Sequence, residues 1–514
     1  MYMNHLSRRQ FVKTGTVLGA SLAAGSAFGL NSCVHRETSV PDVVSEKGKT
    51  GMLSRTGSVD FDVIIAGAGP GGILTARNLA RCGFSVGLFD TSPEGRLGKP
   101  IIIEVEQQIF EKVGIDQPAD DLIPYHPQRI RVFSSRAQEA YQIDCKQYKL
   151  PVALHLDRFV RKLLGEAVAA GVKFHAGYRA VAPLCVGGSV EGARFESSDG
   201  TVEIRGRIVI DATGFNASLA RQLPPECGIV FPEDERHIVS AENHLHDIDT
   251  EAALAAVERG LTGDDETRVV VGNYGNYSTV FSVLSLKHQR AYILIGLKKT
   301  YEKILPVRTA IERFRGEHDY FKGEITGGGG FIRIHHPLDK PVADGFMAIG
   351  EAACHVVPIH GSGVASSLYA ASLASRTAAQ ALKNGDTSET ALWPYAAQFQ
   401  RGRGRILAAL DTVRLSLEKF TANDVADMLE TGLMNKEDMV KGLLVQLPMP
   451  SLTSIPSRLS GFVQNLRVVP KLVGSGITLN QVKRHYSRYP QRYDREEFLA
   501  WSNEKKTIFG SLLS

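Results

Sequence analysis

No two cysteines of this chain form a CxxC pair. Six are spread over the 514 residues, at Cys33, Cys82, Cys145, Cys185, Cys227 and Cys354. A zinc site or a thioredoxin-type redox site would need closely spaced thiols. We therefore predict no metal site. So wide a spread does not indicate a disulfide framework either, and buried free thiols are expected for most of the cysteines.

A strong excess of charge of one sign is also lacking. The formal net charge is +4, and no nucleic-acid-binding motif is present, so a nucleic-acid partner is not expected. No Ser-His-Asp constellation is visible. With 43% hydrophobic and 22% charged residues, the composition is that of a soluble globular protein, and the length allows two or three domains.

The N-terminus lacks an apolar run long enough to span a membrane convincingly. The stretch Thr14–Leu30 is short and only mildly apolar. It follows Ser7–Lys13 (SRRQFVK), which resembles a twin-arginine export signal. We predict a signal peptide at residues 1–33, with a fortuitous basic pair before a core helix as the alternative. Residues 34–59 are polar and predict a linker.

Leu30-Asn31-Ser32-Cys33 is similar to a lipoprotein cleavage box, although Asn31 is not the usual small residue. The predicted location is therefore outside the cytoplasm, either periplasmic or lipid-anchored at Cys33. A protein exported in this way has no ready pool of reduced nicotinamide.

The first chemical motif lies in Phe61–Asp90. An apolar, β-branched strand precedes a glycine-rich turn, a helix follows with apolar residues at helical spacing, and a second strand ends in Asp90. This order is that of a dinucleotide-binding βαβ unit, in which the turn and the helix N-terminus hold a pyrophosphate. Asp90, about 20 residues after the turn, suits a ribose hydroxyl. The predicted contacts of the turn are Gly67, Ala68, Gly69, Pro70, Gly71 and Gly72.

A second set of candidates lies farther along the chain. Lys99 follows the first unit closely enough to offer a cation to the phosphates, although a solvated loop charge is the alternative. A strand end leads into an amphipathic helix near Val152–Gly171, and Asp157 and Arg158 at its start are candidate cofactor contacts. The apolar strand Ile208–Asp211 then ends near Gly214, a further candidate.

The third motif is Asp344–Gly363 (DGFMAIGEAACHVVPIHGSG). It combines a short strand, the pair Gly350-Glu351, and a Gly361-Ser362-Gly363 turn before an Ala-rich helix. A carboxylate here can bind a ribitol chain. The N–H groups at the start of such a helix can face a site where negative charge gathers on reduction.

These motifs, in this order, resemble the p-hydroxybenzoate-hydroxylase-like superfamily of FAD proteins, and within it the geranylgeranyl reductase branch. The resemblance covers residues 60–385 and implies FAD as cofactor. It also implies an α/β fold: a Rossmann-like FAD domain at 60–214 and 341–385, interrupted by a mixed-sheet substrate domain at 215–340. Residues 386–514 are predicted to form a C-terminal helical region.

This chain departs from the family at Glu351, where Asp is usual. At the start of the 152–171 helix, hydroxylases usually have Arg or Gln, and His155-Leu156-Asp157 is more similar to flavin-dependent halogenases.

In such enzymes the flavin performs the redox step and the protein binds, orients and shields it. Cys354, His355 and His360 are candidates for facing the flavin, against the alternative of a core cysteine and loop histidines. Gly327–Gly330 is predicted to be a flexible turn near the return to the cofactor domain.

Several activities remain open from the sequence. The first is an FAD-dependent oxidoreductase acting on an apolar small molecule such as an isoprenoid, a lipid or a polyketide. The second is a monooxygenase or halogenase, although the two tryptophans, Trp393 and Trp501, do not form the W-x-W-x-I-P motif of tryptophan-type halogenases. The third is a flavin enzyme without net redox change, as lycopene cyclases are, although their F-E-E-T stretch is not found. A non-catalytic flavin-binding protein is a fourth.

Only one dinucleotide motif is present, so a tightly bound second nucleotide is not indicated. Together with export, this favours a quinone, oxygen or a redox protein as electron partner.

The segment Ile455–Arg492 contains seven basic residues and no acidic one, with apolar residues interleaved. It suits an anionic membrane surface. The alternative is a helical cap on the flavin domain with a solvated basic face, because Pro456, Pro470, Gly474 and Gly476 are expected to break a helix.

Overall fold

The structure is a computed structural model that describes residues 59–93, 95–272, 278–302, 304–447 and 455–513. The predicted signal peptide at 1–33, with Cys33, and the linker up to residue 58 lie outside the described residues.

The first sheet carries the glycine-rich turn. Its strand order is β16-β17-β10-β1-β2-β7, and the β8–β9 hairpin extends β10. β1 is parallel to both β2 and β10, so their carboxyl ends meet at one edge. Buried valine and isoleucine side chains along β1 explain why this strand is central. The strands are β1 (Phe61–Ala66), β2 (Val86–Asp90), β7 (Lys173–Ala176), β8 (Arg179–Val186), β9 (Ser189–Ser197), β10 (Gly200–Asp211), β16 (Val342–Ala343) and β17 (Phe346–Ala348).

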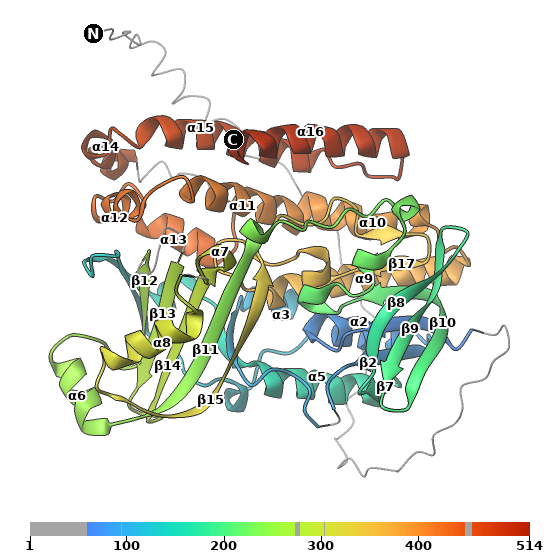
Figure 1. Ribbon diagram of the computed structural model, residues 1–514, viewed down its shortest axis with the longest axis horizontal. Coiled ribbons are helices and arrows are strands. Elements are labelled where there is room, and N and C mark those ends of the chain that lie inside the picture. Colours follow the sequence, from blue (N-terminus) through green and yellow to red (C-terminus); the bar gives the residue numbers. More distant parts are fainter. Residues whose placement is uncertain (1–58, 94, 273–277, 303, 448–454, 514) are drawn as a thin grey trace, which may run out of the picture. The chain divides into compact units, whose positions relative to one another are not determined.

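Helices cover this sheet. α2 (Pro70–Arg81) packs against both α5 (Leu156–Ala169) and α9 (Val364–Asn384), as Figure 1 shows. α9 contributes mostly alanine and serine to the contact, so the two helices can approach closely. The N-termini of α2 and α9 therefore begin near the edge where the parallel strands end.

The second sheet has seven strands in the order β15-β11-β14-β13-β12-β4-β5. Two of them, β4 and β5, come from residues 129–144, which lie inside the range predicted for the FAD domain. The second sheet is therefore not built from residues after 214 alone. The strands are β4 (Arg129–Phe133), β5 (Glu139–Asp144), β11 (Ile238–Ile248), β12 (Glu266–Val271), β13 (Ser278–Ser285), β14 (Arg290–Lys298) and β15 (Phe321–Arg333).

Shorter elements complete this half. β3 (Ile102–Val105) and β6 (Val152–His155) form a separate two-stranded sheet. The helices are α3 (Gln108–Val113), α4 (Cys145–Tyr148), α6 (Thr250–Glu258), α7 (Lys299–Glu302) and α8 (Val307–Gly316).

The prediction of a flexible turn at Gly327–Gly330 was wrong. All four glycines lie within β15 and pair with Glu242 and its neighbours on β11. A Cβ at Gly329 would lie 2.4 Å from Cγ of Glu242, and one at Gly327 would lie 2.3 Å from Nδ1 of His244. Gly327 and Gly329 therefore lack side chains where those of β11 occupy the space.

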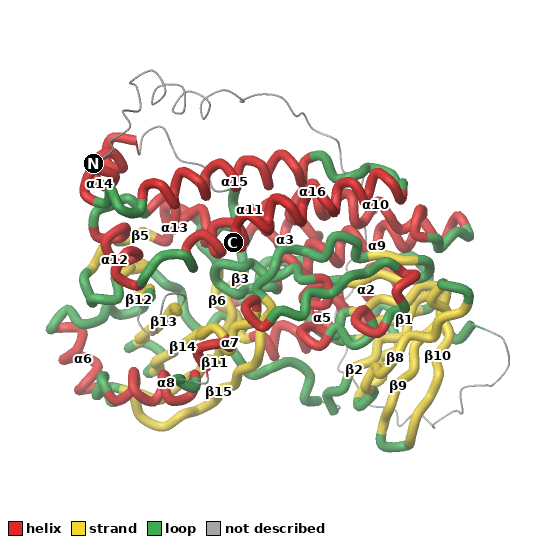
Figure 2. Tube along the Cα trace, turned by 45° about the horizontal axis from the view of Figure 1, so that its top comes forward, coloured by secondary structure: helices red, strands yellow, loops and turns green. Residues whose placement is uncertain are grey.

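The C-terminal region is helical, as predicted, and it packs against the rest of the chain. In Figures 1 and 2, α11, α15 and α16 lie side by side, and α15 contacts both of the others. The helices are α10 (Glu389–Phe399), α11 (Arg405–Leu417), α12 (Ala422–Glu430), α13 (Lys436–Leu443), α14 (Ile455–Gln464), α15 (Val469–Ser487) and α16 (Arg495–Leu513). A π-helical turn, Gln400–Gly404, joins α10 to α11.

The expectation that proline and glycine break the basic segment was wrong for α15. Pro470 lies in its first turn, where no N–H is needed, and Gly474 and Gly476 lie inside the helix. Packing against α11 outweighs the low helix propensity of these glycines. None of the helices in the described ranges combines the length and the hydropathy that crossing a membrane requires.

Ion pairs and hydrogen bonds buried under the C-terminal helices connect them to the segment before β16. Asp411 accepts hydrogen bonds from Nε and Nη2 of Arg414 at 2.8 and 2.6 Å, and from Nδ1 of His336 at 2.9 Å. Asp339 accepts hydrogen bonds from Lys505 and Ser502 of α16. Asp411 and Arg414 are fully buried, so these bonds are shielded from solvent.

Candidate functional site

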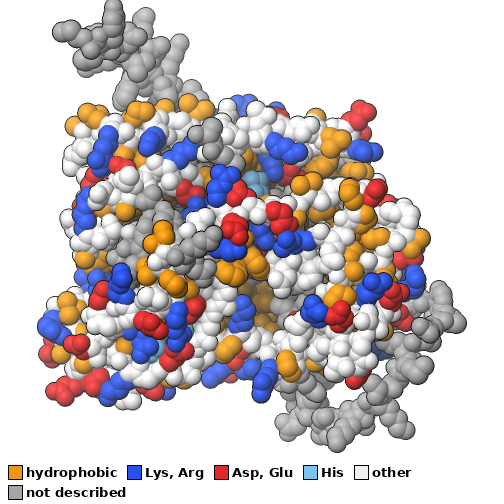
Figure 3. Space-filling view, in the orientation of Figure 1, with side chains coloured by type: hydrophobic (Ala, Val, Ile, Leu, Met, Phe, Trp, Pro, Cys, Tyr) orange, Lys and Arg blue, Asp and Glu red, His pale blue; other side chains and the backbone are white. Residues whose placement is uncertain are grey.

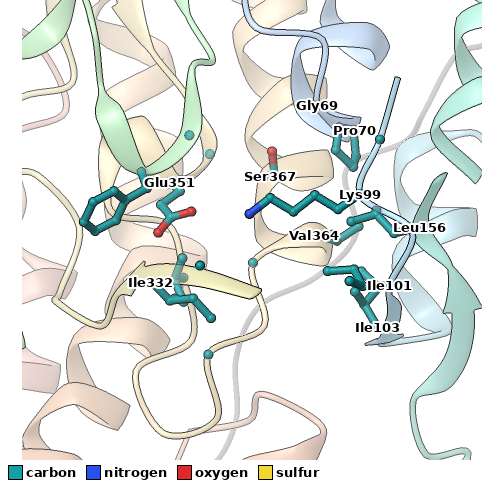
Figure 4. Close-up of a pocket in the computed structure, with 18 of the residues that line it drawn as sticks. Gly69, Pro70, Lys99, Ile101, Ile103, Leu156, Ile332, Glu351, Val364 and Ser367 are labelled. Carbon is teal, nitrogen blue, oxygen red and sulfur yellow. The ribbon is translucent and has the colours of Figure 1, made fainter. Parts of the chain in front are cut away.

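A cavity of about 1310 Å³ lies between the carboxyl edge of the first sheet and the second sheet. Figure 3 shows a recess with hydrophobic side chains in its depth near the middle of one face. The cavity brings together residues from all three motifs of the sequence, and Figure 4 shows several of them around it. The predicted residues in its wall are Gly67, Ala68, Gly69, Pro70, Gly71, Gly72, Asp90, Lys99, Gly214, Gly350, Glu351, His360, Gly361, Ser362 and Gly363.

The glycines of the first motif have different physical roles. Gly67 has a φ of +102°, and a Cβ there would lie 2.2 Å from the carbonyl oxygen of Ala212. A Cβ at Gly72 would lie 2.0 Å from the carbonyl oxygen of Gly67, so α2 packs directly on the turn. At Gly69, by contrast, a Cβ would meet nothing within 4 Å. The space beside Gly69 is open to the cavity and is available to a ligand.

The start of α2 is suited to an anion. Its first turn contains no acidic residue, and no side chain caps it. The free N–H groups and the positive end of the helix dipole therefore face the cavity. Asp90 completes this end: Oδ2 accepts a hydrogen bond from the N–H of Ala68 at 2.7 Å, which fixes the carboxylate beside the turn.

The third motif forms the opposite wall. Oε1 of Glu351 accepts a hydrogen bond from the N–H of Arg333 at 2.9 Å, and burial raises the pKa of Glu351 to about 7. The Lys99 side chain extends toward Glu351 (Figure 4), and its Nζ donates to the carbonyl oxygen of Gly329 at 3.5 Å. α9 begins at Val364 with no acidic residue in its first turn and no side-chain cap, so its N–H groups also face the cavity.

Comparisons with known proteins fit this geometry. Residues 62–222, which contain the glycine-rich turn, match the family described as FAD dependent oxidoreductase. The chain is also 23% identical over 446 residues to the digeranylgeranylglycerophospholipid reductase of Sulfolobus acidocaldarius, covering 84% of this chain and 94% of that protein. The chain is an FAD-dependent oxidoreductase.

Solved structures share its fold. A geranylgeranyl bacteriochlorophyll reductase-like protein of Thermoplasma acidophilum superposes with a TM-score of 0.64 at 18% identity, covering 80% of this chain and 98% of that one. A flavin-dependent brominase superposes with a TM-score of 0.54 at 17% identity, covering 80% of this chain and 98% of that one. Reductases and halogenases therefore share this fold.

FAD fits the cavity of this oxidoreductase. The cavity is continuous from the turn of the first motif to the start of α9. Each of these ends presents uncapped helix N–H groups and a nearby carboxylate, and at the α2 end the space beside Gly69 is open. An extended dinucleotide with a central pyrophosphate needs these features.

Two predicted contacts lie elsewhere in the enzyme. Asp157 pairs with Nη2 of Arg161 at 2.6 Å on α5, and Nη1 of Arg158 donates to the carbonyl oxygen of Asp121 at 3.1 Å. Neither residue lines the FAD cavity, whereas Leu156, one position earlier, does. Helical phasing placed the start of α5 correctly but assigned the cavity-facing position to the wrong residues.

Of the three candidate redox residues, only one lies in the cavity wall. Cys354 is buried behind the sheet, where burial raises its pKa to about 12, and His355 stacks on Phe399 with ring centroids 3.8 Å apart. Burial lowers the pKa of His355 to about 3, so it is neutral. Neither lines the cavity. His360 does, and burial lowers its pKa to about 4, so it too is neutral.

The sequence analysis missed the residues that β3 and the second sheet contribute. They are Glu104, Glu242, Asn243, Phe281, Tyr292, Leu294 and the backbone of Gly328–Gly330. Glu104 lies in β3, just after Ile101–Ile103, and that apolar run was the signal for a strand here. For the others, alternation along the strands limits the choice to one face but does not say which face meets the cavity.

His244, His246 and Glu324 bring ligand atoms within 4.8 Å of one another behind the second sheet. His244, however, is hydrogen-bonded to Glu242 at 2.9 Å and lies 3.1 Å from Nη1 of Arg308. The guanidinium of Arg308 also bonds Glu324 at 2.9 Å. A cation already neutralises these carboxylates, so we assign the cluster to an ion-pair network between β11, β15 and α8.

Proposed function

We propose that this oxidoreductase reduces carbon–carbon double bonds of an isoprenoid lipid. The observation that carries the proposal is the shape of the cavity, which continues from the FAD-binding end to a wall of apolar and aromatic side chains. Phe281, Tyr292 and Leu294 from the second sheet and Leu443 from α13 belong to that wall. Relatives with this fold are named for geranylgeranyl groups, whose reducible bonds are isolated C=C bonds.

In this proposal each end of the cavity binds one part of FAD. Gly69 and the N-terminus of α2 would hold the pyrophosphate, and Asp90 the adenosine ribose. Glu351 would bind the ribitol, and the N-terminus of α9 would face the flavin pyrimidine. Lys99 would add a positive charge beside the ring. Bound FAD supplies two-electron chemistry, and the protein orients the substrate and excludes water from it.

Two alternative activities are weighed against the reductase. The likeness to a brominase shows only that the two folds are similar. Trp393 and Trp501 are both buried among the C-terminal helices. Their indole nitrogens donate to the carbonyl oxygens of Pro490 and His485, away from the cavity. No observation favours a monooxygenase or halogenase, or a lycopene-cyclase-like activity, over the reductase.

We further propose that the protein is exported by the twin-arginine route, with Cys33 as a lipid attachment point. A quinone or a redox protein would then reduce the flavin. Rapid bleaching of the flavin by NADPH, at a rate that matches turnover, would contradict this part of the proposal.

A membrane surface is the proposed source of the substrate. Four apolar side chains on or beside α14 and α15 are exposed. Val463 and Leu466 are 71% and 70% exposed, and Val473 and Ile477 are 47% and 54% exposed. Figure 3 shows hydrophobic and basic side chains together along the edge where these helices lie. Such a mixture favours binding to an anionic lipid surface.

The test is single-turnover reoxidation. The purified protein is loaded with FAD, reduced anaerobically with dithionite, and mixed with a geranylgeranyl lipid. We expect the flavin to reoxidise and the lipid mass to rise by two hydrogens for each bond reduced. Reoxidation only by oxygen, with an oxygenated or halogenated product, would instead establish the monooxygenase alternative.

A further inference from the structure

We propose that Glu104 is the proton donor of this enzyme, an inference that rests on the proposed reduction of C=C bonds. The geometry that carries it is a carboxyl group without a cationic partner in the wall of the substrate end of the cavity. Adding hydrogen across a double bond needs a proton as well as a hydride, and no other role has been assigned to this residue.

Glu104 is held rigidly in β3. Its strand pairs with β6, with Glu104 opposite Ala153. The hydroxyl of Ser362, in the third motif, donates to the carbonyl oxygen of Glu104 at 3.0 Å. The backbone of Glu104 is thereby fixed to the turn that precedes α9, at the proposed flavin-pyrimidine end. Glu104 lines the same cavity as Tyr292 and Leu294 of the second sheet.

The neighbours of Glu104 are apolar or neutral. Ile102, on the same face of β3, packs with Tyr125, Val283 and Tyr292. The titratable groups that interact with Glu104 are Tyr125, from the loop before β4, Tyr292 of β14, and Cys145 of α4. Burial raises the pKa of each of these, so all three are uncharged near neutral pH.

No cation offsets this burial within the part of the chain that the structure describes. Glu106, two residues along, differs: it accepts hydrogen bonds from Nη1 and Nη2 of Arg403 at 3.0 and 2.6 Å. Glu104 has no such partner, and burial raises its pKa to about 7. The carboxyl group is therefore protonated to a substantial fraction at neutral pH and mostly protonated below it, and it can give up its proton near the pH at which an enzyme works.

The proposed step balances as follows. The O–H bond of Glu104 breaks and a C–H bond forms at one carbon of the double bond. The other carbon receives a hydride from the reduced cofactor, which is oxidised by two electrons. The Glu104 carboxylate then recovers a proton from water. The substrate gains two hydrogens in all.

The test uses the FAD-loaded enzyme with Glu104→Gln, Glu104→Asp as the conservative variant, and Glu111→Gln as a control at an exposed position of the same segment. Single-turnover reduction of a geranylgeranyl lipid is measured between pH 5 and 9. We expect E104Q to be slower by about 100-fold or more, E104D to recover part of the rate, and E111Q to match the wild type. FAD affinity should be unchanged in all of them. The wild-type rate should fall as pH rises through about 7.

A second readout does not depend on activity. The carbonyl stretch of a protonated carboxyl group, identified by its shift in D₂O, is followed by infrared difference spectroscopy. Burial raises the pKa of Glu351 to the same range, so the Glu104 band is the one that E104Q loses and Glu351→Gln retains. We expect that band to be lost with a midpoint near pH 7.

The outcomes separate the two proposals. If the wild type reduces the lipid and E104Q does so within threefold, Glu104 is not the donor, although the proposed function stands. If the wild type reduces no prenyl lipid, the proposed function fails, and the infrared titration decides for Glu104. A midpoint near the ordinary carboxyl pKa would then overturn the inference, and a midpoint near 7 would support an acid role toward another substrate.

Discussion

Gly69 and Gly72 lie in one turn but are expected to respond differently to substitution. A Cβ at Gly72 would meet a backbone oxygen 2.0 Å away, whereas Gly69 faces open space. We expect Gly72→Ala to lower the free energy of unfolding by about 1–3 kcal/mol. Gly69→Leu should leave the apoprotein about as stable as before but lower FAD affinity by about tenfold or more, which is ~1.4 kcal/mol.

Thermal unfolding of the apoproteins and fluorescence titration with FAD measure both effects. Equal losses of apoprotein stability in the two variants would contradict the assignment of open space beside Gly69 to a ligand.

Glu351 predicts a pH effect on stability. Its folded-state pKa of about 7 lies above its ordinary value of 4.5, so the folded apoprotein holds this proton more tightly than the unfolded chain does. Its contribution to stability is therefore fully present below pH 4.5 and is lost as pH rises through 7. Glu351→Gln should remove this dependence. Urea denaturation of both apoproteins should show E351Q gaining stability relative to the wild type across that window, and a constant difference would contradict the prediction.

Sequence reasoning worked best where chemistry constrains the backbone. The glycines of the first motif and Gly350, Gly361 and Gly363 of the third could be placed in the cavity wall from the sequence, because a phosphate or a flavin needs bare backbone at those spacings. Asp157 and Arg158 could not be placed in the same way. Whether a side chain at the start of α5 meets the cavity depends on a rotation of about 100° per residue, which helical periodicity alone leaves undetermined at a helix end.

At the scale of elements, α11 is attached to the rest of the fold by buried charges. Asp411 holds both Arg414 and His336, and the carboxylate and the guanidinium are fully buried. The Arg414 guanidinium is the chief cause that holds the pKa of Asp411 well below its usual range, against its burial. Asp411→Ala would leave a buried cation without its partner. We expect it to lower the free energy of unfolding by about 3–5 kcal/mol.

The matched control is the exposed pair Arg194–Glu203, at 2.8 Å, whose side chains are 46% and 48% exposed. Glu203→Ala should cost about 0–1 kcal/mol, because exposed pairs contribute little. Chemical denaturation of both variants makes the comparison. Similar losses would mean that the buried pair does not anchor α11.

Two elements show where local propensity misleads. Gly327–Gly330 suggested a turn, yet β11 provides a full set of strand partners on one side. Gly474 and Gly476 suggested a break, yet α11 stabilises α15 along its length. In both cases the deciding contacts are distant in sequence, so a window of neighbouring residues could not have revealed them.

At the scale of the whole molecule, binding to a lipid surface can be tested apart from any anchor. In a chain with Cys33→Ser, the exposed residues Val463, Leu466, Val473 and Ile477 are replaced together by Ser. Each apolar side chain of this kind contributes roughly 1 kcal/mol when it enters lipid, so we expect binding to anionic vesicles to fall by at least about tenfold. Vesicle co-sedimentation measures it.

The control replaces Val186 and Val230, which are 54% and 77% exposed on other elements, by Ser. This variant should bind vesicles as the parent does. Equal binding by all three proteins would contradict a docking face on α14 and α15.

The contacts of α16 with Asp339 have a consequence for how the enzyme matures. Asp339 precedes β16, the strand that leads into the third motif, and its partners Ser502 and Lys505 follow it by 163 and 166 residues along the chain. A ribosome releases a chain from its N-terminus onward. A nascent chain could therefore form the glycine-rich turn early, but it would lack the support behind the opposite wall. We expect flavin to be captured only after α16 has been synthesised and has packed against Asp339.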